Sequence, residues 1–247
     1  MKTALFIWCS GLLLMACGGA APAPRTGEDT AVAQPAEDPA AGGQGALVIE
    51  ERPLFQVALE AELYEKYQSM GLPDELGRLL AQTHVEFNIP DTFELAAFED
   101  NPLWQYDCAL KAKSGKVEIR FRVVKGELAP PEGVAGAEGM APEKIIAMDL
   151  MNVLMTLNGA NLVADMQTHP AEEARTRFNA EAYTTATFAP VPEFAPYEIG
   201  SAGVFYPQGL GKVIVISLLN GMNDPQSRTE WVTGANAMRF ADQKGPQ

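Results

Sequence analysis

The sequence predicts a domain of the α+β class, built from antiparallel strands and helices. Two stretches, residues 104–123 and 203–219, predict β-hairpins around turns that contain glycine. The first alternates between apolar and polar residues, and the second contains a continuous β-branched run at residues 213–216. A third stretch, residues 143–157, is apolar on nearly every side of a helix, which predicts a buried central helix. We expect residues 48–247 to form this single domain, because about 200 residues are enough for a sizeable core.

The chain begins with the features of a secretion signal. One positive charge precedes the apolar run 4–15, which is shorter than the roughly 20 residues that a membrane-spanning helix needs. Residues 14–17 then read Leu-Met-Ala-Cys. This tetrad resembles the lipobox of bacterial lipoproteins, which implies cleavage after Ala16 and acyl chains, such as palmitate, on Cys17. We therefore expect residues 1–16 to be a signal peptide and Cys17 to be the lipidation site.

A polar linker follows the cysteine. Residues 18–46 contain no aromatic residue, no Leu and no Ile, so they cannot bury a core, and we expect residues 17–47 to be a flexible tether. Gly18, rather than Asp, follows the lipidated cysteine, which in Gram-negative bacteria of the enteric type favours export to the outer membrane. The predicted location is therefore the cell envelope, at the outer membrane and facing the periplasm.

The charge of the chain argues against nucleic acid as a partner. The formal net charge is −14, and removal of residues 1–16 takes one of the 18 basic side chains and none of the 32 acidic ones. Binding to phosphates needs clustered Lys and Arg, and the richest cluster here is Arg120, Arg122 and Lys125. We expect solubility beside a lipid leaflet to explain the acidic composition.

The cysteines leave no disulfide within the domain. Cys9 would leave with the signal peptide, Cys17 would be acylated, and only Cys108 remains. Cys108 alternates with Trp104 and Tyr106 on the apolar face of a strand, so we expect a buried and inert thiol.

The remaining pattern places further elements along the chain. Amphipathic spacing and capping residues predict helices at residues 54–70, 73–82, 171–178 and 227–240. Alternation predicts strands at residues 85–89, 104–110, 117–123, 183–188, 203–206 and 212–219, the last of which should be central because it is β-branched throughout residues 213–216. Residues 126–142 are rich in Gly, Pro and Ala and predict an exposed loop.

Two groups of side chains have alternative interpretations. Glu118, Arg120 and Arg122 share the polar face of the first hairpin, where they could bind an anion, although a covered face with cross-strand pairs is the commoner arrangement. The methionines of residues 143–157 could indicate a soft metal or an adaptable groove, but their spacing favours a packed core. We therefore expect no metal and no cofactor.

Candidate catalytic residues are few. The two histidines, His84 and His169, do not form a zinc motif with each other, and a zinc site would need distant Asp or Glu residues. Ser201 lies in a segment that lacks the first glycine of a nucleophile elbow. Residues 209–212 read Gly-Leu-Gly-Lys but lack the earlier glycine of a phosphate-binding loop, and a hairpin turn explains them. We expect no catalytic residue.

Several segments of the sequence resemble the PsbP/DcrB-like superfamily, which includes plant photosystem extrinsic subunits, Mog proteins and bacterial lipoproteins. They lie at residues 85–90, 104–123, 178–183, 212–219 and 237–240. The resemblance implies an antiparallel sheet between helices, an α/β/α sandwich, and a role in binding or assembly without covalent chemistry. It carries over no ligand residues.

These observations predict a lipid-anchored envelope protein whose domain binds a protein partner or stabilises an envelope complex. One alternative is an envelope hydrolase that uses Ser201 or a site at His84 and His169. The other is a carrier of small molecules, which requires a deep apolar pocket beneath the loop at residues 126–142.

Overall fold

A computed structural model describes residues 53–97, 99–128, 139–158, 165–207 and 209–242. The predicted signal peptide, the linker and Cys17 lie outside the described residues. The helices are α1 (Leu54–Ser69), α2 (Asp74–Gln82), α3 (Pro142–Leu157), α4 (Ala171–Phe178) and α5 (Pro225–Ala235). The strands are β1 (Val85–Phe87), β2 (Phe93–Leu95), β3 (Cys108–Ala112), β4 (Val117–Lys125), β5 (Asp165–Thr168), β6 (Ala182–Phe188), β7 (Ile199–Tyr206), β8 (Gly211–Leu219) and β9 (Met238–Phe240).

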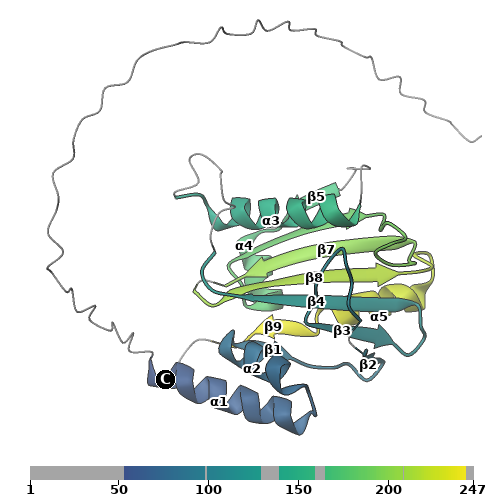
Figure 1. The fold of residues 1–247 in the computed structure, drawn as a ribbon. Helices are drawn as coiled ribbons and strands as arrows, with labels where there is room; N and C mark the ends of the chain where they lie inside the picture. The colour runs from purple at the N-terminus through teal and green to yellow at the C-terminus, as the bar shows by residue number, and fades with distance from the viewer. Residues whose placement is uncertain (1–52, 98, 129–138, 159–164, 208, 243–247) are drawn as a thin grey trace, which may run out of the picture. The chain divides into compact units, whose positions relative to one another are not determined.

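Seven of these strands form one antiparallel sheet, and helices cover both of its faces. The strand order is β2-β3-β4-β8-β7-β6-β5, and β1 pairs with β9 in a separate two-stranded sheet. Helix α3 packs on β6 and β7 from one side (Figure 1). Helices α2, α4 and α5 contact β4, β6 and β8 from the other side, where α1 packs on α2. The predicted α+β class, with an antiparallel sheet between helices, is confirmed.

Strand β8 is the centre of the sheet, as its β-branched sequence predicted. It pairs with β4 through nine residues and with β7 through seven, and its odd and even residues enter different hydrophobic clusters. Val213 and Val215 pack beneath α2 and α4, whereas Ile214 and Ile216 pack beneath α3. Burial on both faces explains why no polar alternation appears in this strand.

Two predictions about helices are wrong. The helix at 143–157 is not buried on all sides, because only one layer of helix covers this face of the sheet, and Met151 and Met155 on its outer side are 37% and 57% exposed. The helix predicted at 227–240 ends at Ala235, and Met238–Phe240 forms β9 instead. Antiparallel pairing with Val85–Phe87 of β1 satisfies the backbone of that segment, which is a long-range contact that helical periodicity does not register.

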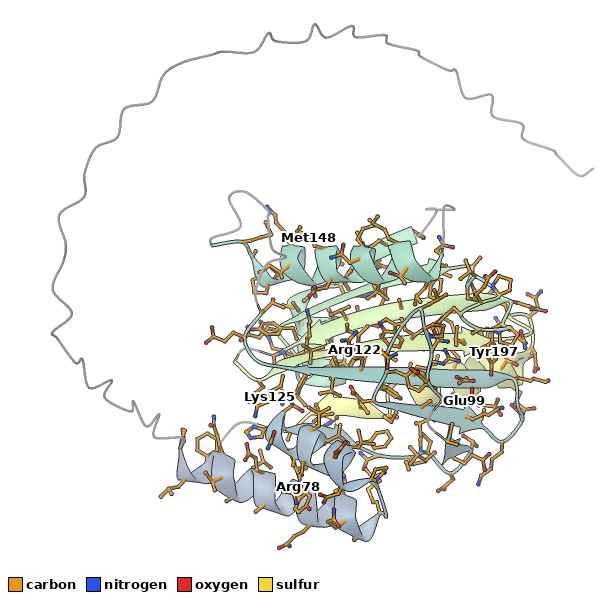
Figure 2. The ribbon with its side chains drawn as sticks, in the orientation of Figure 1. Arg78, Glu99, Arg122, Lys125, Met148 and Tyr197 are labelled. Carbon is orange, nitrogen blue, oxygen red and sulfur yellow. The ribbon has the colours of Figure 1, made fainter. Side chains whose placement is uncertain are left out.

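The polar face of the first hairpin is covered at Glu118 and Arg120, which form an internal ion pair, whereas Arg122 is exposed. The Arg120 side chain donates to a Glu118 carboxylate oxygen over 2.6 Å, and its guanidinium lies 4.8 Å from the ring centre of Phe194. The hydroxyl of Tyr197 donates to the other Glu118 oxygen over 3.0 Å, and burial raises the pKa of this phenol. Figure 2 shows Tyr197 and, farther along β4, the exposed Arg122. Of the two interpretations, the covered face with internal ion pairs is the one found.

Candidate functional site

A polar pocket lies on the sheet face between α4 and α5, with a volume of about 270 Å³. Its floor comes from β6, β7 and β8, and its two walls come from the segment around α4 and from α5. The floor residues are Thr185, Thr187, Ser201, Gly203, Val215 and Ser217, and the wall residues are His169, Arg177, Tyr183, Trp231, Val232 and Ala235. Hydroxyl groups therefore replace apolar side chains on a face that elsewhere forms the core.

The register of the sheet explains why these hydroxyls gather. Thr187 pairs with Ser201, which pairs with Ser217, so the three side chains form one row across β6, β7 and β8. Directly paired residues point to the same face of a sheet, so this row is continuous. In the neighbouring row, Gly203 separates Thr185 from Val215, and a Cβ added at Gly203 would meet a Val215 methyl carbon at 3.1 Å. The glycine thus keeps the middle of the floor open.

His169 fixes the α4 wall to the floor. One ring nitrogen, Nδ1, lies 3.1 Å from a Glu173 carboxylate oxygen, and the other, Nε2, lies 2.8 Å from the Thr185 hydroxyl. The ring also stacks on Tyr183, with ring centres 4.4 Å apart. The bond from His169 lowers the pKa of Glu173, so this carboxyl group is ionised at neutral pH. A neutral imidazole would then donate from Nδ1 to Glu173 and accept the Thr185 hydroxyl at Nε2.

Arg177 brings a cation to the same wall, but its charge is already compensated. Its guanidinium lies 3.2 Å from the second Glu173 oxygen and donates to the Asn236 side-chain oxygen over 3.3 Å. It also lies over the rings of Phe178 and Tyr183, at 5.1 and 5.5 Å from their centres. The wall therefore offers one ion pair with little excess positive charge.

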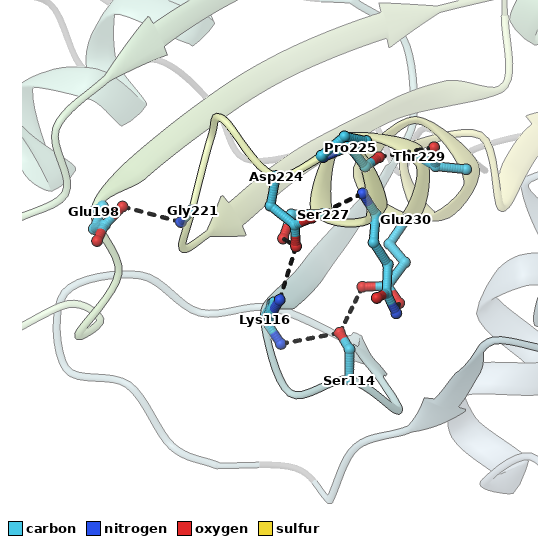
Figure 3. A network of polar contacts seen from close by, with 10 residues as sticks. Ser114, Lys116, Glu198, Gly221, Asp224, Pro225, Ser227, Thr229 and Glu230 are labelled. Atoms are coloured by element: carbon cyan, nitrogen blue, oxygen red, sulfur yellow. Dashed lines mark hydrogen bonds and ion pairs between the residues drawn. The ribbon is translucent and has the colours of Figure 1, made fainter.

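The opposite wall, α5, is fixed by a polar network at its first turn (Figure 3). Asp224 caps the helix by accepting from the Gln226 amide, and it forms an ion pair with Lys116 at 2.8 Å. These contacts, with that to Lys116 the largest, lower the pKa of Asp224 to about 2. The Ser114 hydroxyl donates to a Glu230 carboxylate oxygen over 2.5 Å. Both contacts join α5 to the turn between β3 and β4.

Close packing also holds α5 against the sheet. Gly234 faces the sheet, and a Cβ at this position would lie 2.7 Å from the Phe93 ring and 2.8 Å from an Ile119 carbon. The absence of a side chain lets the helix approach β2 and β4. Trp231, one turn earlier and half-buried, is then held at the rim of the pocket.

The candidate residues from the sequence are divided between two places. His169 and Ser201 line the same pocket, although the near hydroxyl partner of His169 is Thr185 and not Ser201. His84 does not belong to this pocket: it is fully buried between α2 and β1, and its Nε2 lies 3.7 Å from a Glu60 oxygen. A joint site at His84 and His169 is therefore not formed.

The structure confirms the predicted burial of one residue, Cys108, and adds three hydroxyl residues that the sequence did not indicate. Cys108 is buried, as predicted, and burial raises the pKa of its thiol, which favours the inert interpretation. Thr185, Thr187 and Ser217 were not among the sequence candidates. The sequence signal for Thr185 and Thr187 is a run of threonines in β6, and such a run occurs in many strands that have no site. Ser217 stands in β8 among apolar residues without such a signal.

The carrier alternative requires an apolar pocket beneath the loop at 126–142. Residues 129–138 lie outside the described residues, so that prediction stays untested. The pocket found between α4 and α5 is lined by none of residues 126–128 or 139–142. Its floor is also polar, whereas the carrier alternative requires an apolar cavity.

Within the described ranges, no group of three or more His, Cys, Asp or Glu side chains is arranged to hold a metal ion. In the same part of the chain, no helix has the length and the apolar character needed to cross a membrane.

Comparisons with solved structures find likenesses to this chain. No family model and no curated protein sequence matches the chain. The solution structure of cyanobacterial PsbP (CyanoP) from Synechocystis sp. PCC 6803 is similar at 12% sequence identity and a TM-score of 0.39, over 64% of this chain and 88% of that one. A likeness at this level does not establish a family, so membership of the PsbP/DcrB-like superfamily stays a prediction.

Proposed function

We propose that this chain is a lipid-anchored binding protein of the cell envelope, whose domain acts without covalent chemistry. The lipobox supports acylation of Cys17, and Gly18 supports a position at the outer membrane facing the periplasm. The polar pocket between α4 and α5 supports binding as the role of the domain. The composition of residues 18–46 supports a tether that would let the domain reach a ligand or an envelope protein partner away from the leaflet.

The single observation that carries the binding role is the row of hydroxyls at Thr187, Ser201 and Ser217. A small neutral ligand with several hydroxyl groups, of the size of a monosaccharide, matches this lining. Such a ligand both donates to and accepts from hydroxyl side chains. An anionic ligand is disfavoured, because Glu173 already compensates the charge of Arg177 and the chain is acidic. The pocket volume of about 270 Å³ is at the small end for ligand sites, so the ligand should be small.

Calorimetry with a panel of monosaccharides, polyols and sugar acids tests this proposal on the full chain. Thr187→Val and Ser201→Ala remove hydroxyls from the floor with little change in shape, and we expect each to weaken binding by about 1 kcal/mol, or about fivefold. Thr176→Ala, on the exposed side of α4, is the matched control and should leave affinity unchanged. Equal binding by all three variants would place the ligand elsewhere.

Anchoring and partners need a separate experiment. The wild-type chain should fractionate with membranes and incorporate labelled palmitate, whereas Cys17→Ala should do neither. Affinity capture of both forms from solubilised membranes, followed by mass spectrometry, then asks whether an envelope protein is bound only by the anchored form. A Cys17→Ala chain that still carries the label would disprove acylation at this cysteine.

A hydrolase is the second candidate, because Glu173, His169 and Thr185 form a carboxylate, imidazole and hydroxyl chain. It ranks second for a geometric reason. Strand β6 is paired on both edges, so its amides are used by the sheet and only side chains such as Ser201 remain to stabilise an oxyanion. The test is turnover of chromogenic esters: hydrolysis by the wild type that disappears in both His169→Phe and Thr185→Val would favour the enzyme, and no turnover would eliminate it.

A further inference from the structure

Three methionines form a stripe along the outer side of α3, and we propose that this stripe, Met148, Met151 and Met155, is a binding site for a soft monovalent cation, Cu(I). The spacing of three and four residues places them within about 60° of one another around the helix and within about 10 Å along its axis. The structure overturns the explanation of these residues as core, which the sequence had favoured.

The buried side of α3 is complete without them. Ile146, Leu150, Leu154 and Leu157 are fully buried against the sheet. The methionine stripe lies about 140° away from the centre of this buried side. Met151 and Met155 are accordingly 37% and 57% exposed, and Met148 is half-buried (Figure 2). Packing therefore does not account for large apolar residues at these positions.

The chemistry of the side chain suggests which ligand accounts for them. Thioethers are soft, neutral donors, and soft sulfur ligands select Cu(I) among biological metals. Three thioethers on one helical face supply the low coordination number that such a cation accepts, and their flexible side chains can converge on one ion. The acidic composition of the chain also favours a cation over an anion.

The stripe differs from an adaptable surface for protein binding in its composition. No exposed Leu, Ile, Phe or Trp accompanies the methionines on α3, among the large apolar side chains that the structure describes as exposed. Hot spots of protein interfaces are enriched in aromatic residues and Arg. A stripe that offers only thioethers fits a soft metal better than a partner helix.

Competition with a chromophoric Cu(I) chelator, under anaerobic conditions, tests this site on the full chain. Cys9→Ser and Cys17→Ser are introduced in every sample, so that these two thiols do not compete for the metal. We expect one Cu(I) per chain, with sulfur as the ligand in X-ray absorption spectra. Met151→Leu and Met155→Leu conserve volume and should each weaken binding by about tenfold or more.

Met166 of β5 provides a matched control, because it is 38% exposed and lies on another element. Met166→Leu should leave the affinity unchanged. Since thioethers carry no proton, affinity should also be the same at pH 5.5 and 7.5 once the protonation of the chelator is allowed for. The proposal is overturned if the wild type does not compete for Cu(I), if Met166→Leu weakens binding as much as Met151→Leu, or if affinity falls tenfold at the lower pH. None of these outcomes depends on the pocket between α4 and α5.

Discussion

The hydrogen bond between His169 and Thr185 should be measurable as a coupling between two substitutions. His169→Phe keeps an aromatic ring on Tyr183 but removes both ring nitrogens. Thr185→Val keeps the shape of the side chain but removes the hydroxyl. Each variant alone breaks the 2.8 Å contact that joins the α4 wall to the floor of the pocket.

The expected magnitudes follow from burial and partners. The His169 side chain is 12% exposed, so Thr185→Val leaves Nε2 poorly hydrated and should lower the free energy of unfolding by about 1 to 2 kcal/mol. His169→Phe also loses the contact with Glu173 and should cost about 1 to 3 kcal/mol. Because both variants break the same bond, the double variant should be about 1 kcal/mol more stable than the sum of the single losses implies.

Urea unfolding of the full chain, followed by circular dichroism and tryptophan fluorescence, measures these free energies. Thr176→Val, on the exposed side of α4, is the control and should change stability by less than about 0.5 kcal/mol. A coupling energy below about 0.3 kcal/mol would show that the two side chains do not interact, because substitutions at unconnected positions add within about that value.

Three further predictions concern the supports of the site and the thiol. Gly234→Ala should destabilise the domain by about 1 to 3 kcal/mol in urea unfolding, since its Cβ would meet Phe93 and Ile119, whereas exposed Thr233→Ala should be nearly neutral. The pKa of Asp224 is lowered from 3.8 to about 2, so its stabilising contribution is present above about pH 4 and is lost as the pH falls from 4 to 2. Asp224→Asn should therefore reduce the fall in the midpoint temperature of thermal unfolding over this pH range. If the midpoint temperature of the variant falls as steeply with pH as that of the wild type, the ion pair does not stabilise the fold. Cys108 should resist a thiol reagent in the native chain and react fully in denaturant, and rapid native labelling in a Cys9→Ser, Cys17→Ser background would contradict its burial.

The local pattern of the sequence was enough for most of the elements. Alternation around a glycine turn predicted the pairing of β3 with β4. Glycines between two apolar runs predicted the pairing of β7 with β8, and continuous β-branching in residues 213–216 predicted the central strand. Strands β2 and β5, of three and four residues, were not predicted, whereas β1, also of three residues, was. Strand β9 was taken for a helix because its partner, β1, lies about 150 residues away along the chain.

Local sequence patterns did not predict which residues form the candidate site. A hydroxyl on a strand has no local signal that separates a pocket floor from a solvated face, so Thr187 and Ser217 were missed. Ser201 and His169 were noticed only as rare or reactive residue types, and the partner that His169 meets, Thr185, could not be anticipated. The methionines of α3 were assigned to the core, because their spacing does not show whether a second layer of the protein covers the outer side of the helix.

Patterns among neighbouring residues were enough to predict the α+β class, which the structure confirms, and they also predict a lipid anchor and a linker, which stay predictions. Tertiary structure alone decided which residues meet. The row of Thr187, Ser201 and Ser217 exists because register aligns three strands, and Met151 and Met155 are exposed because α3 covers the sheet in one layer. Local pattern follows from the geometry of a single element, whereas a site depends on distances between elements, which are set by the packing of the whole domain.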